Sequence, residues 1–145
     1  MKEWTAPANI ESIPFFMEKI NRELDALGCS RLARRKINVS LDELLCNIAS
    51  YAYGQESGEM TAQLRYDEDS RIVSISLIDS GIAYNPLEKE DPDTTLCAEK
   101  RPVGGLGILI VKKKMDKIEY RREDGRNILT IYKRIQEDGD TPSLP

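Results

Sequence analysis

Two polar side chains with complementary chemistry stand four residues apart in a stretch that is predicted to be helical. Glu43 and Asn47 are separated by about one helical turn, so their side chains point to nearly the same face of the helix. An amide oxygen is a suitable ligand for a hard cation such as Mg²⁺, and a carboxylate can take a proton from an attacking hydroxyl group. Together they could act on a metal-bound phosphate. The spacing alone also fits a solvated helix face.

An aspartate and a glycine follow directly on an apolar stretch that is predicted to be a β-strand. Asp79 ends this stretch, and Gly81 comes two residues later. A carboxylate at a strand end can accept a hydrogen bond from an amine of a ligand, and a glycine lets a ring or a backbone come close. Taken alone, the same two residues are also typical of an ordinary turn.

A cluster of glycines, Gly104, Gly105 and Gly107 around Leu106, opens the next predicted helix. Backbone N–H groups at glycines can approach phosphate oxygens, and the N-terminus of a helix carries partial positive charge that favours anions. The cluster is neither a Walker motif nor a Rossmann fingerprint, because no strand directly precedes it and no Lys-Ser/Thr pair follows it. A lone glycine cluster is a weak signal for a phosphate site.

The residue types that the chain lacks restrict its chemistry. The chain has no histidine, so it cannot by itself form a Ser-His-Asp or Cys-His catalytic site, bind a metal through histidine or carry a phosphohistidine. A general base must therefore be a carboxylate, a lysine, a tyrosine or a cysteine. The three cysteines, Cys29, Cys46 and Cys97, are far apart, which favours free thiols over a disulfide framework or a zinc site.

The composition is that of a soluble globular protein. The 145 residues carry a net charge of −4, which argues against a nucleic-acid partner because phosphate backbones attract basic surfaces. No apolar run approaches the roughly 20 residues that a membrane span needs, and the first residues lack the apolar stretch of a signal peptide. We therefore expect a cytoplasmic protein that binds neither nucleic acid nor membrane.

The hydrophobic pattern predicts the elements that must position these residues. Helices are expected at 13–27, 34–53 and 106–115, strands at 60–66, 71–78, 117–122 and 127–135, and an extended segment at 1–8. Because the strands follow one another as hairpins and the helices must cover one face, the predicted fold class is α+β. It is a two-layer sandwich with the helices on one face of a mixed, largely antiparallel sheet. A single domain is expected over residues 1–135, with a flexible tail at 136–145.

The order of the motifs resembles that of a known family. From about residue 5 to residue 135, the chain resembles the anti-sigma-factor serine/threonine kinases of the GHKL superfamily, whose members share a Bergerat-type ATP pocket. Residues 43–47 are similar to the family's N-box, and residues 79–86 and 104–108 to its two glycine boxes. The resemblance covers most of the chain and implies the same sandwich fold.

The resemblance also implies roles for single residues and two cofactors, ATP and Mg²⁺. Asn47 would bind Mg²⁺, Glu43 would be the general base, and Asp79 would accept from the adenine amino group beside Gly81. The phosphates would be contacted by Gly104, Gly105, Leu106 and Gly107. A mobile lid at 87–103 would cover them, and Thr130 would lie near the adenine.

In function, the resemblance implies an ATP-dependent protein kinase that phosphorylates a serine or threonine of a small anti-anti-sigma (STAS) protein and sequesters a sigma factor. Members of the family often form homodimers. Two alternatives remain open. One is a nucleotide-gated binding module without catalysis, against which the presence of Glu43 counts. The other is a stand-alone histidine-kinase catalytic domain, which would need a separate histidine-bearing protein, since this chain has no helical hairpin to dock one.

Overall fold

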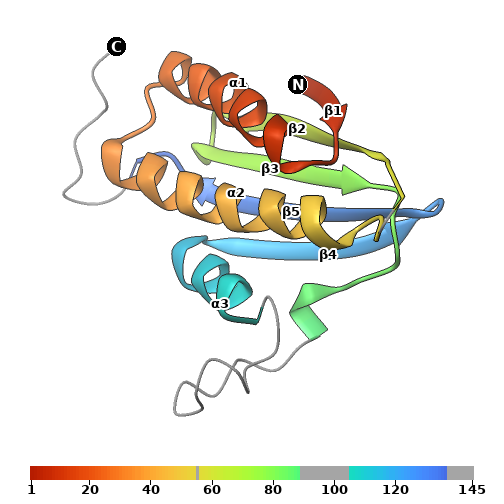
Figure 1. The fold of residues 1–145 in the computed structure, drawn as a ribbon. Helices are drawn as coiled ribbons and strands as arrows, with labels where there is room; N and C mark the ends of the chain where they lie inside the picture. The colour runs from red at the N-terminus through yellow and green to blue at the C-terminus, as the bar shows by residue number, and fades with distance from the viewer. Residues whose placement is uncertain (55, 89–104, 137–145) are drawn as a thin grey trace.

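The computed structural model describes residues 1–54, 56–88 and 105–136. Within them, the helices and strands follow one another in the predicted order (Figure 1). The strands are β1 (Lys2–Pro7), β2 (Glu59–Asp67), β3 (Ile72–Asp79), β4 (Lys117–Glu123) and β5 (Arg126–Arg134). The α-helices are α1 (Ile13–Ala26), α2 (Arg31–Tyr51) and α3 (Gly105–Lys114), and two short 3₁₀ turns are η1 (Ile10–Ser12) and η2 (Pro86–Glu88).

The five strands form one sheet in the order β1-β2-β3-β5-β4. The three α-helices lie on one side of this sheet, as Figure 1 shows, so the predicted two-layer α+β sandwich is confirmed. All four strand pairs are antiparallel, so the sheet is fully antiparallel rather than mixed. The extended N-terminal segment is the edge strand β1, which pairs with β2.

The core lies between the helices and the sheet. Side chains on one face of α1 and α2 pack against alternate residues of the strands, as a helical stripe and a two-residue strand period require. The largest fully buried side chains are Phe16, Ile20, Leu24, Ile37, Leu41, Leu45, Met60, Ile75, Leu77, Ile108 and Ile131. The same alternation places the odd-numbered residues of β3 and β5 toward the helices and the even-numbered ones on the open face.

The termini of the elements follow local chemistry. Helix α2 begins three residues earlier than predicted, because the hydroxyl of Ser30 accepts a hydrogen bond from the backbone N–H of Ala33 and caps the helix. The β4–β5 hairpin turns at Asp124 and Gly125, both with positive φ, which suits a tight turn matched to the strand twist.

Two predicted segments fall largely outside this structure. Residues 89–104, which hold most of the expected lid, and residues 137–145, which hold most of the expected tail, lie outside the described residues. In the part of the chain that is described, no helix has an apolar stretch long enough to pass through a lipid bilayer.

Candidate functional site

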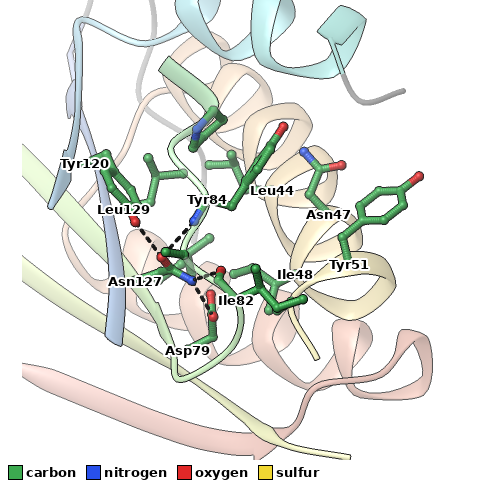
Figure 2. Close-up of a pocket in the computed structure, with 14 residues that line it drawn as sticks. Leu44, Asn47, Ile48, Tyr51, Asp79, Ile82, Tyr84, Tyr120, Asn127 and Leu129 are labelled. Carbon is green, nitrogen blue, oxygen red and sulfur yellow. Dashed lines mark hydrogen bonds between the residues drawn. The ribbon is translucent and has the colours of Figure 1, made fainter. Parts of the chain in front are cut away.

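A cavity opens between α2, the ends of β3 and β5, and the loop that follows β3 (Figure 2). Most of its lining is apolar, and its polar side chains include Asp79 and Asn127 from the sheet and Asn47 from α2. An apolar slot with a few polar groups is the usual form of a small-molecule site. Of the residues singled out in the sequence, the structure thus brings Asn47 and Asp79 to one cavity.

Asp79 is the last residue of β3 and is only 6% exposed. Its Oδ1 accepts two hydrogen bonds, from the backbone N–H of Gly81 at 2.9 Å and from the side-chain amide of Asn127 at 2.9 Å. Within the described residues, Oδ2 makes no hydrogen bond. A buried carboxylate with one oxygen held and the other available is suited to accept from a donor group of a ligand.

Gly81 lies where the loop after β3 passes over the end of α2. A Cβ atom at this position would stand 2.0 Å from the carbonyl oxygen of Ala52, so no larger residue fits without moving the backbone. The next residue, Ile82, donates its backbone N–H to the same oxygen at 2.8 Å. The glycine therefore allows the loop to close one end of the cavity against α2.

Glu43 and Asn47 lie on α2, one turn apart, and both are half-buried. Asn47 lines the cavity, whereas the carboxylate of Glu43 lies against α3: a Cβ atom at Gly107 would be 2.5 Å from its Oε2. The structure thus brings Glu43 next to the glycine motif, although the two are far apart in the sequence.

The surroundings of α2 are also electrostatically negative here. Burial, followed by the carboxylates of Asp42 and Glu43, raises the pKa of the Cys46 thiol above its ordinary value.

The glycine motif is described from Gly105 onward. Gly105 and Leu106 are the first residues of α3, as predicted, and Gly107 is buried in its first turn. Gly104 lies outside the described residues. The start of α3 therefore lies close to Glu43, with the partial positive charge of a helix N-terminus.

The structure does not bring Thr130 to the cavity. This residue lies on the open face of the sheet, where its hydroxyl is hydrogen-bonded to that of Ser76 on β3 at 2.7 Å. The residues of β5 that line the cavity are Asn127 and Leu129. Sequence reasoning missed Asn127, although the two-residue strand period places it on the same face as the apolar Leu129 and Ile131.

Tyr120 and Tyr84 also line the cavity, as Figure 2 shows. The phenol of Tyr120 donates to the Oδ1 atom of Asn127, and the backbone N–H of Tyr84 donates to the same atom at 3.3 Å. Tyr84 falls within residues 79–86, which are similar to a glycine box, but neither tyrosine was predicted to bind a ligand, because tyrosines more often serve in packing than in binding. Their place at the site follows from the pairing of β4 with β5 and from the path of the loop.

Known proteins resemble this chain over most of its length. Residues 6–133 match the family model of the histidine kinase-like ATPase domain. The chain is 32% identical over 102 residues to the serine/threonine-protein kinase BtrW of Bordetella bronchiseptica, which covers 68% of this chain and 70% of that protein. It is also 25% identical over 146 residues to the serine-protein kinase RsbW of Bacillus mycoides. The matched segment covers 95% of this chain and 90% of that relative.

The family model covers most of the chain, and it spans every element that forms the cavity, from α2 to β5. The relatives named as kinases match over two thirds or more of their own length. The chain therefore belongs to the histidine kinase-like ATPase family, and within it resembles the serine/threonine-protein kinases.

Proposed function

We propose that this protein binds ATP with Mg²⁺ and transfers its terminal phosphate to a serine or threonine of a partner protein. The observation that carries this proposal is the buried Asp79 in an apolar cavity whose wall, α2, also carries Glu43 beside the start of α3. The family membership supports ATP as the ligand, and the relatives named as serine/threonine kinases support the reaction.

The adenine base would occupy the apolar cavity. The Oδ2 atom of Asp79 would accept from the adenine amino group, and Gly81 would let the loop close beside the ring against α2. The phosphates would lie toward the start of α3, where Gly104, Gly105, Leu106 and Gly107 would present backbone N–H groups. Backbone donors at a helix N-terminus favour phosphate oxygens. Thr130 takes no part in this proposal, since it lies on the other face of the sheet.

Mg²⁺ would be bound by the amide oxygen of Asn47 together with the phosphates. The residues on hand fit such a site, because Asn47 lines the cavity and lies one helical turn from the carboxylate of Glu43. Mg²⁺ commonly keeps several waters and takes only one or two protein ligands beside substrate phosphates.

Glu43 would act as the general base. Its carboxylate would take the proton of the partner's hydroxyl group while that oxygen forms a bond to the γ-phosphorus and the bond to ADP breaks. Phosphoryl transfer depends mainly on positioning and charge stabilisation, so the base contributes only part of the rate. Since the chain has no histidine, a carboxylate on the helix that also carries Asn47 is the natural candidate.

For the partner, we propose a small anti-anti-sigma protein of the STAS class as substrate and a sigma factor as the sequestered protein. This part rests on the resemblance of the sequence and on the relatives named RsbW. A homodimer and a cytoplasmic location belong to the same proposal.

The test compares wild type with Glu43→Gln. Partners are first captured on the purified protein with and without ATP, and phosphorylated sites on the captured proteins are mapped. Transfer is then measured with labelled ATP at saturating nucleotide. Glutamine keeps the size of the side chain but cannot take up the proton, so kcat should fall about 10²–10⁴-fold with little change in ATP affinity. Glu68→Gln, an exposed glutamate in the β2–β3 turn, is the control and should behave as wild type.

Two results would change the proposal. Transfer by the Glu43→Gln variant within a few-fold of wild type would show that Glu43 is not the base. If the wild type binds ATP but transfers phosphate to no captured partner, the protein is better described as a nucleotide-gated binding module. Phosphorylation of a histidine on the partner would instead identify a stand-alone histidine-kinase catalytic domain.

A further inference from the structure

Asn127 occupies a junction between three strands and a loop. In the sheet register it stands opposite Asp79 on β3 and opposite Arg122 on β4, and it is only 7% exposed. Figure 2 shows its amide between Asp79, the loop at Ile82 and Tyr84, and Tyr120. A buried amide at such a place must find partners for all its polar atoms.

Each polar atom of this amide is used within the protein. The Nδ2 group donates one hydrogen bond to Oδ1 of Asp79 and another to the carbonyl oxygen of Ile82, each at 2.9 Å. The Oδ1 atom accepts from the backbone N–H of Tyr84, from the phenol of Tyr120 and from Nη1 of Arg122 at 3.1 Å. A primary amide offers two donors and one oxygen, so nothing remains for a ligand.

The same contacts allow only one orientation of the amide. Rotation by half a turn would bring the NH₂ group against the guanidinium of Arg122 and the backbone N–H of Tyr84, both of which can only donate. It would also bring the amide oxygen against the carboxylate of Asp79. Asn127 therefore presents its NH₂ group to Asp79 permanently.

The fixed amide of Asn127 in turn restricts the orientation of the Asp79 carboxylate. Its Oδ1 is held from two sides, by Asn127 and by the backbone of Gly81, whereas Oδ2 has no hydrogen bond within the described residues. The loop that supplies the Gly81 contact is itself held to β4, since Nη1 of Arg122 also donates to the carbonyl oxygen of Gly81 at 2.9 Å. The carboxylate is thus fixed, with a single acceptor left to meet a ligand in the cavity.

We infer that Asn127 is a positioning residue that makes the site selective for a 6-aminopurine over a 6-oxopurine, by holding the Asp79 carboxylate in one orientation. This inference rests on the proposed nucleotide function. A 6-aminopurine presents an amino group at position 6. A 6-oxopurine presents an oxygen there and a proton on the neighbouring ring nitrogen, N1. A carboxylate that is free to turn can accept either from the amino group of a 6-aminopurine or from the N1 proton of a 6-oxopurine. A carboxylate held in one orientation cannot adjust to both donors.

The experiment measures the affinities of Mg-ATP and Mg-ITP by calorimetry, because these two nucleotides differ only at positions 6 and 1 of the base. Wild type should bind ATP about 10- to 100-fold more tightly than ITP, the cost of an unmatched buried polar group. In Asn127→Ala only the backbone N–H of Gly81 still holds the Asp79 carboxylate, which can then turn about this single contact, so the preference for ATP should fall about tenfold or more. Ser74→Ala, on the strand of Asp79 but on the open face, is the control and should keep the wild-type ratio.

The ratio of the ATP and ITP affinities distinguishes a positioning role of Asn127 from a role that only supports the fold. If Asn127→Ala weakens ATP and ITP by the same factor, or changes neither affinity, the inference is overturned. Equal affinity of wild type for both nucleotides also overturns it, while the proposed kinase activity would stand. Failure of wild type to bind either nucleotide would overturn the proposed function itself. Should Asn127→Ala not fold, as judged by circular dichroism, Asn127→Ser carries the same test.

Discussion

At the scale of single residues, the site depends on which polar atoms the protein leaves unused. Both polar atoms of the Asn127 side chain are hydrogen-bonded within the protein, whereas only one carboxylate oxygen of Asp79 is. Two buried polar residues in direct contact therefore have different roles. One sets the geometry, and the other is left to meet a ligand. Residue type alone does not distinguish them, because either an amide or a carboxylate can bind a base.

The residue Asp79 gives the most direct test of nucleotide binding. In Asp79→Asn the oxygen can keep the contacts with Gly81 and Asn127, but the new NH₂ group replaces Oδ2 and opposes the adenine amino group. ATP affinity should fall about 10- to 100-fold by calorimetry, since a donor then faces a donor. Asp124→Asn, in the exposed β4–β5 turn, is the matched control. Equal ATP affinity of Asp79→Asn and wild type would remove Asp79 from the site.

The close contact between Gly107 and Glu43 yields a second prediction. A methyl group at residue 107 would stand 2.5 Å from Oε2 of Glu43, so the carboxylate must move in Gly107→Ala. Alanine is also the better helix former, by roughly 1 kcal/mol, so the melting temperature should be kept or raised. We expect phosphoryl transfer to the partner to fall at least about tenfold, on the scale of general-base effects. Unchanged transfer would argue against a role of Glu43 at this place.

At the scale of elements, the short helix α3 must be held in place for the glycine motif to serve any site. Its first turn lies against Glu43 of α2, and its far end is secured to β5. There Asp116 donates its backbone N–H to the carbonyl oxygen of Tyr132 at 2.9 Å, and its carboxylate accepts from the backbone N–H of Arg134 and from Lys133. The turn between α3 and β4 is thus held to the sheet.

This turn gives a prediction on stability. Lys133 is only 3% exposed, so removal of the Asp116 carboxylate weakens the pairing of a buried charge and removes one hydrogen bond to the backbone N–H of Arg134. Asp116→Ala should lower the free energy of unfolding by about 1–3 kcal/mol, measured by urea denaturation. Glu68→Ala, an exposed residue of another turn, should change it by less than about 0.5 kcal/mol. A loss no larger than that of the control would show that Asp116 does not secure α3.

At the scale of the whole molecule, the cavity is built from parts that are distant in the sequence. Its walls come from α2, from the loop after β3, and from both strands of the last hairpin (Figure 2). A ligand bound there would contact every layer of the fold at once. Binding to the folded state alone should therefore stabilise the entire domain.

Thermal melting tests this coupling. With Mg-ATP at about 100 times its dissociation constant, the folded state gains about 2.7 kcal/mol, and the melting temperature should rise by about 5–10 °C for a domain of this size. Asp79→Asn at the same nucleotide concentration should show a clearly smaller rise. If wild type shows no shift with Mg-ATP, the cavity does not bind it.

The sequence by itself determined the elements and their order. The helices, the strands and the hairpin turns arise from local periodicity and turn chemistry, so they could be predicted to within a few residues. The motif residues Glu43, Asn47, Asp79 and Gly107 also stood out by their type and spacing. The fold class followed, because consecutive hairpins and amphipathic helices can bury their apolar faces in few ways.

The tertiary structure alone decided which distant residues meet. The strand period gives the face on which Asn127 lies, but only the register between β3 and β5 places it opposite Asp79. A shift of one residue in that pairing would exchange the two faces. Likewise, the contact of Glu43 with Gly107 depends on how α2 packs against α3. Such contacts depend on packing and pairing across tens of residues, which no local pattern in the sequence records.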